Sequence, residues 1–233
     1  MNIQQEYEAT VKPEIEALIE EVNQGIGSNQ DIRDYHQGWR VFFSPVIYKP
    51  KVLLIGINPG AGAPGLHDLG FWDGSEMFEY TNPEYSFALA RETQDAFSQA
   101  GLDDVLATST VKTNYFFLST TKEKDLYEIT SWLGRSSGAA DELLGDKLFR
   151  KSAEWTKSLI KLIQPEVIVC EGKGAYENVT ELFPEYGEYN WANDCGYTVV
   201  PSENLVIIGY SRMLSRIKNK PALAELLKRF VQL

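Results

Sequence analysis

Residues 52–60, with the sequence VLLIGINPG, place one carboxamide at the end of an apolar run. Pro59 disfavours a helical backbone at Asn58 and rigidifies it. Gly56 and Gly60 let the chain bend sharply and let a ligand approach closely. An Asn side chain is uncharged at any pH and is a poor general base, but it can orient a water molecule and accept hydrogen bonds from it. The alternative interpretation is a turn in which Asn58 caps its own backbone.

The same loop contains a second pattern, because residues 60–65 read GAGAPG and match G-x-G-x-x-G. That fingerprint needs its first glycine directly at a strand end and its third inside a helix that starts there. The apolar run ends near Ile57, and the segment after Gly65, LHDLGFWDGSEMFEYTNPE, has no helical period. No strand ending in Asp or Glu follows to bind a ribose. We therefore do not expect a dinucleotide site.

A second carboxamide, Asn114, stands in residues 110–119, TVKTNYFFLS, which are rich in β-branched and aromatic side chains. An amide offers a donor and an acceptor together, which matches the edge of a nucleobase. The alternative is a polar residue whose hydrogen bonds are satisfied at a strand end.

A basic segment near the C-terminus combines cations with apolar residues. Residues 212–216, RMLSR, place two apolar side chains between two arginines, and Lys218 and Lys220 continue the basic edge. Such a loop suits a wedge that fills the gap left by a flipped base while its cations contact phosphates. The alternative makes Met213 and Leu214 ordinary core residues at the start of the last helix.

The elements that must position these residues alternate between helix and strand. Short apolar or β-branched runs predict strands at 51–57, 110–119, 166–170, 197–200 and 205–210. Helical spacing of apolar residues predicts helices at 13–23, with Pro13 in the first turn, and at 85–100, 149–163, 172–182 and 221–232. Strands separated by helices imply a parallel sheet covered on both faces, whose ligands bind at the carboxyl ends of the strands. Function is therefore expected in the loops after Ile57, Phe117, Cys170 and Gly209.

Composition and charge narrow the class of protein. The 233 residues suit one α/β domain, and the mixture of 43% hydrophobic and 24% charged residues is typical of globular proteins. We expect no membrane segment and no secretory signal. The two cysteines, Cys170 and Cys195, are too few for a four-cysteine metal site, and they fit a reducing, cytoplasmic location. The net charge of −11 argues against binding nucleic acid through bulk charge, although residues 209–233 carry six basic residues and one acid.

Taken together, the motifs resemble those of the uracil-DNA glycosylase superfamily. VLLIGINPGAG at 52–62 closely resembles its first active-site motif, nearest to the mismatch-specific and thymine-DNA branch and then to the single-strand-selective branch. KTNYFF at 112–117 looks like the strand that delivers the base-reading Asn, and QPEVIVCEGKGA at 164–175 looks like the third strand and its turn. LVIIGYSRMLS at 205–215 stands where the second active-site motif belongs. Order and spacing agree from about Phe43 to Phe230, which is most of the chain.

The resemblance implies a fold and an activity. The fold is a single uracil-DNA glycosylase-like domain over residues 1–233, a three-layer α/β/α sandwich with a four-stranded parallel sheet of order 2-1-3-4, on which residues 1–42 pack as an N-terminal helical extension. The activity is that of a monomeric DNA glycosylase without metal or cofactor. It flips uracil, or a related deaminated or mismatched base, out of single- or double-stranded DNA and hydrolyses the N-glycosidic bond.

The resemblance also implies roles for particular residues. Asn58 would position the attacking water at C1′. Phe71 would stack on the base, with Trp72 or Tyr80 as the next candidates, and Asn114 would read the edge of the base. The complete set of base-binding residues would be Gly56, Ile57, Pro59, Gly60, Phe71 and Asn114. The DNA strand would be contacted by Gly172, Lys173, Ser211, Arg212, Met213, Arg216 and Lys218.

The second motif departs from the superfamily pattern. It typically begins His-Pro-Ser or Asn-Pro-Ser, whereas Gly209-Tyr210-Ser211 stands here. With Gly209 in place of the His, no side chain at that position can donate to the anion of the leaving uracil, where charge develops. Tyr210 is the candidate substitute, and neither His36 nor His67 is an obvious catalyst.

Two rival interpretations stay open. The first is a glycosylase-fold protein that binds a base, a nucleotide or damaged DNA with weak or no cleavage, which the altered second motif and the net charge favour. The second is an unrelated small-molecule enzyme built on the same sheet.

Overall fold

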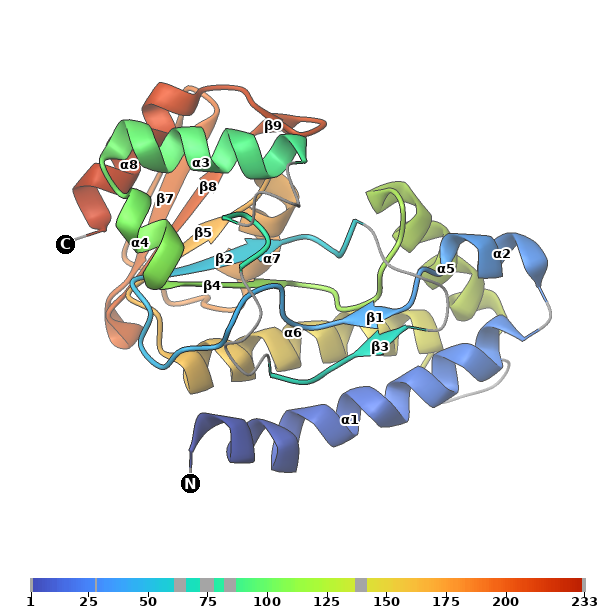
Figure 1. The fold of residues 1–233 in the computed structure, drawn as a ribbon. Helices are drawn as coiled ribbons and strands as arrows, with labels where there is room; N and C mark the ends of the chain where they lie inside the picture. Colours follow the sequence, from blue (N-terminus) through green and yellow to red (C-terminus); the bar gives the residue numbers. More distant parts are fainter. Residues whose placement is uncertain are drawn as a thin grey trace. The chain divides into compact units, whose positions relative to one another are not determined.

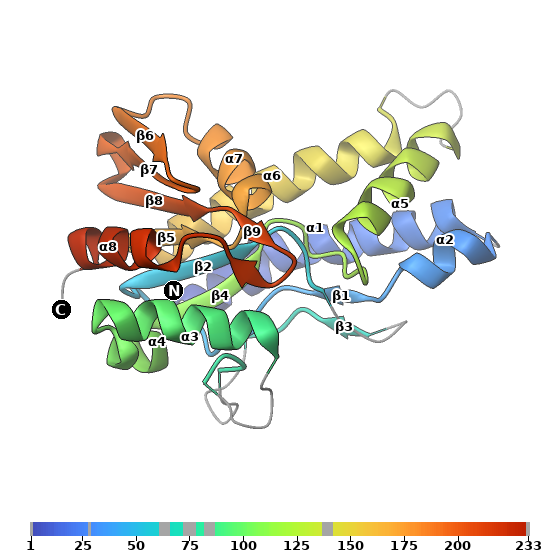
Figure 2. The same ribbon diagram turned by 90° about the horizontal axis from the view of Figure 1, so that it is seen from above.

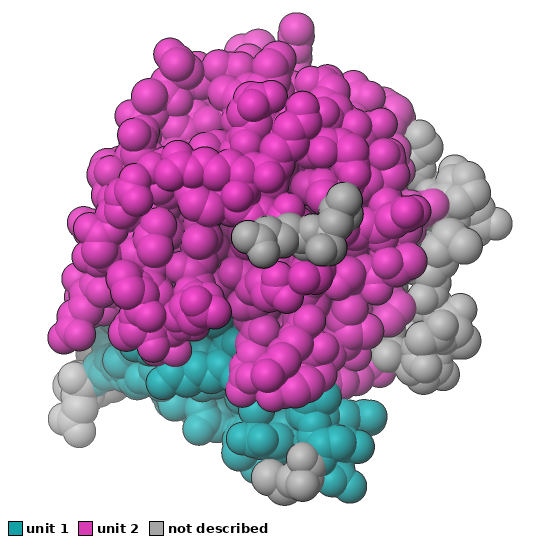
Figure 3. Space-filling view, turned by 90° about the vertical axis from the view of Figure 1, so that its left-hand side faces the viewer, with its two compact units in different colours: residues 1–41, 58–70, 114–162 teal, residues 42–57, 71–113, 163–233 magenta. Residues whose placement is uncertain are grey.

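The computed structural model describes residues 2–27, 29–60, 66–71, 78–81, 87–136 and 142–231. The chain forms two compact units, each assembled from three segments (Figure 3). Unit 1 contains residues 1–41, 58–70 and 114–162, and unit 2 contains residues 42–57, 71–113 and 163–233. The N-terminal helices thus share unit 1 with two later segments of the chain.

Unit 2 is built on a mixed sheet of six strands in the order β4-β2-β5-β8-β7-β6 (Figure 1). The strands are β2 (Val52–Gly56), β4 (Thr110–Asn114), β5 (Val167–Cys170), β6 (Glu188–Ala192), β7 (Cys195–Val200) and β8 (Leu205–Tyr210). Strands β2, β5 and β8 run parallel, whereas β7 is antiparallel to β8 and β6 is antiparallel to β7. The protein is therefore an α/β protein, as expected, but its sheet is wider than the four parallel strands that we expected.

The unpredicted strand β6 forms a hairpin with β7. Its turn residues, Asn193 and Asp194, both adopt positive φ angles of 54° and 65°. Two-residue hairpin turns of type I′ require this conformation, and Asn and Asp tolerate it better than most residues. The hairpin brings the chain back along β8 and adds an antiparallel edge to the sheet.

Helices cover both faces of the sheet in unit 2. One face carries α3 (Ala88–Ala100), α4 (Asp103–Thr108) and α8 (Lys220–Phe230), and α3 lies beside α8 (Figures 1 and 2). Alternate strand residues and helix residues form one apolar cluster there, including Val52, Leu54, Val167, Val169, Ile208, Phe97, Leu223 and Leu227. Helix α7 (Lys173–Glu181) packs on β5 and β8, and the hydroxyl of its Tyr176 forms a hydrogen bond of 2.6 Å with Thr198 of β7. Alternation of side chains along each strand therefore separates the two helical layers.

Unit 1 is mainly helical, with α1 (Ile3–Ile26), α2 (Gln30–Tyr35), α5 (Glu123–Ser136) and nearly all of α6 (Leu144–Ile163). Helix α5 packs against α1 and α2. Glu14 on α1 accepts hydrogen bonds from Lys151 and Trp155 on α6, at 2.9 and 3.0 Å. A short parallel pair, β1 (Trp39–Arg40) and β3 (His67–Asp68), completes the unit.

Helix α1 corrects the predicted start at Pro13. It begins ten residues earlier, at Ile3, where Asn2 and Gln5 form a reciprocal capping box, and Pro13 lies inside the helix. Tyr7 and Val11 extend the buried stripe toward the N-terminus, and this burial offsets the hydrogen bond that Pro13 cannot donate.

The predicted strand 110–119 is too long, because β4 ends at Asn114. Beyond it the backbone pairs inside unit 1 instead: Arg40 donates to the Phe117 carbonyl at 2.9 Å, and Ser119 exchanges hydrogen bonds with residues 37 and 38. Helices α2, α4 and α5 were not predicted either. Among the described residues, no helix has the length and apolar character needed to cross a membrane.

Candidate functional site

Asn58 directly follows the buried strand β2 and its loop residue Ile57, and its carboxamide is held by two hydrogen bonds. Its Nδ2 donates to Thr120 Oγ1 at 2.8 Å and to the Pro59 carbonyl at 3.2 Å. The backbone N–H of Thr120 also donates to the Pro59 carbonyl, at 3.1 Å. The carboxamide oxygen accepts from no other described residue. The local interpretation of Asn58 as a cap of its own turn explains the Pro59 bond but not the bond to Thr120.

Thr120 is the residue of this site that the sequence did not indicate. It is fully buried and lies 62 positions from Asn58 in the chain. Its residue type and its place after Ser119 carry no functional signal, and only the fold brings it to the carboxamide.

The other residues of the first motif differ in exposure. Gly56 and Ile57 are buried and end a segment of unit 2, whereas Pro59 is buried and Gly60 is exposed in unit 1. A Cβ atom at Gly60 would meet no heavy atom of the described residues within 4 Å. Asn114 ends β4, is buried with 4% exposure, and belongs to unit 1 with Asn58.

The three aromatic candidates for stacking on a base have different surroundings. Phe71 is half-buried and packs edge-to-face on Phe42, with ring centroids 4.8 Å apart. Trp72 lies outside the described residues. Tyr80 is 1% exposed and its hydroxyl donates to Glu171 Oε1 at 2.6 Å, so its ring is part of the core of unit 2. Of the two described candidates, only Phe71 is partly exposed.

An unpredicted buried ion pair in unit 2 joins the middle of one strand to the residue that follows another. Lys112 in β4 pairs with Glu171, the residue after β5, and both side chains are at least nine-tenths buried. The Lys112 ammonium also lies 4.6 Å from the centroid of the Tyr80 ring, and Tyr80 donates to the same carboxylate. Burial, and then the Glu171 charge, raise the pKa of Tyr80, so this hydroxyl keeps its proton and stays a donor. The cluster ties the Tyr80 loop to the edge strand β4 and to the residue that follows β5.

The glycine in the second motif is required by packing. A Cβ atom at Gly209 would lie 2.4 Å from the Tyr176 ring, closer than any real contact. Tyr210 is 1% exposed inside the apolar cluster, and its hydroxyl has no hydrogen-bond partner among the described residues. Burial, and then the Glu171 charge, raise the pKa of Tyr210. The motif therefore offers no surface donor at the position of the superfamily His.

The segment after β8 forms a small hairpin, β9 (Arg212–Met213) and β10 (Arg216–Ile217), with apolar side chains at its tip. Met213 is 63% exposed and Leu214 is 90% exposed, so the interpretation of these residues as core is wrong. Leu214 has φ 55°, in the left-handed region, which a leucine rarely adopts. Helix α8 begins only at Lys220, beyond the hairpin.

The predicted phosphate contacts gather around this hairpin within unit 2. Arg212 Nε lies 3.1 Å from the position of a Cβ atom at Gly172, which has φ 125°. Among the described residues neither Arg212 nor Arg216 forms an ion pair, whereas Lys218 pairs with Asp194 at 3.4 Å and Lys173 with Glu177 at 3.5 Å. Ser211 faces the same turn, since its N–H donates to the Asp194 carbonyl at 2.7 Å.

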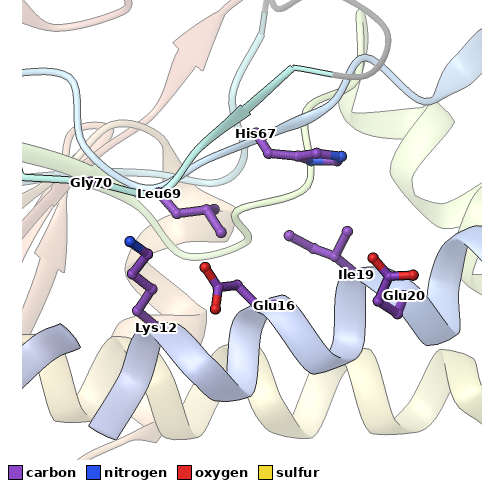
Figure 4. A pocket seen from close by; sticks show the side chains of 7 residues that line it. All are labelled: Lys12, Glu16, Ile19, Glu20, His67, Leu69 and Gly70. Atoms are coloured by element: carbon purple, nitrogen blue, oxygen red, sulfur yellow. The ribbon is translucent and has the colours of Figure 1, made fainter. Parts of the chain in front are cut away.

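The two histidines have structural surroundings. His36 is 9% exposed and packs edge-on against Trp39, and burial, followed by the charge of His67, lowers its pKa to about 4. His67 is exposed and lines a shallow pocket of about 290 Å³ between α1 and the β3 segment of unit 1 (Figure 4). The described residues contain no group of three or more His, Cys, Asp or Glu side chains that could hold a metal ion.

Comparison of the chain with protein-family models and with curated protein sequences gives no match. The resemblance to the uracil-DNA glycosylase superfamily therefore depends on the sequence motifs alone.

Proposed function

We propose that this protein is a glycosylase-fold DNA-binding protein that hydrolyses the N-glycosidic bond of uracil or a related deaminated or mismatched base. The observation that carries the proposal is the Asn58 carboxamide. Its nitrogen is bound to Thr120 and Pro59, and its oxygen is left to accept a hydrogen from a water molecule.

In the proposed reaction Asn58 orients this water toward C1′ of the flipped nucleotide. The C1′–N bond breaks with oxocarbenium character, the water oxygen bonds to C1′, and the proton that the water loses ends on the departing base. Asn58 takes no proton in this sequence. Positioning alone can contribute a large part of such a rate enhancement.

The β9–β10 hairpin supports a DNA substrate. Its tip presents Met213 and Leu214 to solvent, and the cations Arg212 and Arg216 flank them without an ion pair among the described residues. An apolar wedge between cations is what a protein needs to fill the gap in a base stack while it holds the phosphates.

A second candidate function is supported by the altered second motif. Because Gly209 packs against Tyr176 and the Tyr210 hydroxyl is buried, neither of these two residues offers a donor for the anion of a leaving base. A protein that binds a flipped base or damaged DNA without turnover would retain Asn58 and the hairpin but not need that donor.

The test uses purified protein and labelled oligonucleotides that contain U opposite G, U opposite A, T opposite G, or U in a single strand. Alkali cleavage of abasic sites measures turnover, and titration at several salt concentrations measures binding. The variant is Asn58→Ala, and the matched control is Asn190→Ala, which removes an exposed carboxamide from strand β6.

We expect turnover that Asn58→Ala abolishes and Asn190→Ala leaves unchanged. Salt-sensitive binding without cleavage would contradict the proposed enzyme activity and support the second candidate function, that of a binding protein. Absence of both binding and cleavage on all four substrates would overturn both proposals.

A further inference from the structure

Thr120 determines which end of the Asn58 carboxamide faces outward. A threonine hydroxyl carries a single proton. The Thr120 hydroxyl donates that proton to the Lys122 carbonyl at 2.7 Å. Its oxygen can therefore only accept toward Asn58, and the Asn58 atom 2.8 Å away must be the amide nitrogen.

The second proton of the Asn58 amide is also committed, because Nδ2 donates to the Pro59 carbonyl at 3.2 Å. If the carboxamide turned over, its oxygen would face two acceptor oxygens and both hydrogen bonds would be lost. The same Pro59 carbonyl accepts the backbone N–H of Thr120, so the loop of Asn58 and the segment of Thr120 hold one another in place.

We infer that Thr120 is a positioning residue that fixes Asn58 as a hydrogen-bond acceptor only. The group that Asn58 binds must then be a donor, such as water or the N–H of a base, and not a carboxylate, a phosphate or an oxyanion. Where that donor is the attacking water, the inference rests on the proposed function. The inferred orientation of the Asn58 carboxamide does not depend on the proposed function.

The first test measures the orientation directly. The side-chain amide of Asn58 is assigned in a ¹⁵N–¹H spectrum by its absence in Asn58→Asp, and the solvent exchange of its protons is compared with that of the exposed Asn190. We expect a nuclear Overhauser contact to the Thr120 methyl group and slow exchange. Thr120→Val, which keeps the shape but removes the hydroxyl, should raise the exchange rate about tenfold or more, as expected when a hydrogen bond worth about 1.4 kcal/mol is lost. Thr120→Ser should retain slow exchange.

The second test uses turnover. Thr120→Val should lower kcat by about tenfold to a hundredfold, the range expected when a reactive group is misplaced, with little change in KM. The neighbouring Thr121→Val is the matched control, since Thr121 is exposed. In the Asn58→Asp background both side-chain oxygens are acceptors, so the orientation of the side chain no longer matters. Thr120→Val should therefore lower kcat by a much smaller factor in this background. A merely structural role of Thr120 would give the same loss in both backgrounds.

The inference is overturned if the Asn58 amide of the wild type exchanges as fast as that of Asn190, or if Thr120→Val leaves its exchange unchanged. Equal losses of kcat in the wild-type and Asn58→Asp backgrounds would also overturn it. If the wild-type protein binds and cleaves none of the oligonucleotides, the proposed function fails, and the amide exchange still decides the orientation.

Discussion

The buried ion pair between Lys112 and Glu171 predicts a large loss of stability when one partner is removed. Replacing Lys112 with Met leaves a carboxylate that is 2% exposed with the Tyr80 hydroxyl as its partner. Breaking a buried pair in this way costs about 3–5 kcal/mol, because a charge stays buried without compensation. For a chain of this length about 1 kcal/mol changes the melting temperature by roughly 2–4 °C, so Lys112→Met should lower it by about 6–20 °C.

The double variant Lys112→Met with Glu171→Leu should be more stable than Lys112→Met alone, because both charges are gone. It leaves the buried Tyr80 hydroxyl without its acceptor, which costs about 1–3 kcal/mol. Adding Tyr80→Phe should recover most of that amount. The cycle therefore separates the cost of an unpaired charge from the cost of an unpaired hydroxyl.

Urea and thermal unfolding, followed by circular dichroism, measure these differences. The matched control is Lys228→Met, which breaks a pair with Glu225 whose two side chains are both well exposed. That variant should change the free energy of unfolding by less than about 1 kcal/mol. A cost of less than about 1 kcal/mol for Lys112→Met, or a double variant that is as unstable as the sum of the single ones, would refute the reasoning.

Three further predictions concern pH, the hairpin tip and the second motif. The pKa of His36 is about 4 in the folded protein, against the ordinary value of 6.5 that applies to the unfolded chain, so the unfolded state binds the proton first as the pH falls. Wild type should lose roughly 2 kcal/mol of stability between pH 7 and pH 5 from this group alone, and His36→Phe should lack that part of the pH dependence in urea titrations. Leu214→Gly removes an exposed side chain from a residue in the left-handed region, so the free energy of unfolding should change by no more than about 1 kcal/mol. Cleavage of uracil in duplex DNA should fall, and unchanged duplex activity would show that Leu214 does not act as a wedge in the base stack. Gly209→Ala should destabilise the fold by about 1–3 kcal/mol through its collision with Tyr176, and an unfolding midpoint equal to that of wild type would contradict the packing argument.

The sequence predicted most reliably the elements that have a continuous apolar run or a regular apolar stripe. Strands β2, β5 and β8 and helix α8 lie within one or two residues of the predicted ranges, because continuous apolar runs and helical stripes have few alternatives. The edge strand β6 was missed because its sequence, EYNWA, is mostly exposed and has no buried run. The early part of α1 was missed because Pro13 looked like a first-turn residue, while the capping box at Asn2 was a signal that could have extended the helix.

The site was predictable only where one local motif contains the chemistry. The sequence indicated Asn58 from its neighbours, and the exposed hairpin tip excludes the interpretation of Met213 and Leu214 as core residues. Thr120 and the pair of Lys112 with Glu171 could not be predicted, because each depends on a contact between residues 59 to 62 positions apart. A lysine within a strand and a glutamate after another strand are ordinarily exposed, and only the fold reveals that these two are buried together.

The close packing of Gly209 on Tyr176 has a consequence for how such sequences can change over evolution. A His or an Asn cannot be accommodated at position 209 while the Tyr176 ring stays in place, since the two side chains would occupy the same space. The two positions are therefore expected to covary among related sequences, with a polar residue at 209 accompanied by a small residue at 176. A lineage that replaced the glycine in one step would first pass through an unstable intermediate, which tends to preserve the combination of Gly209 with Tyr176.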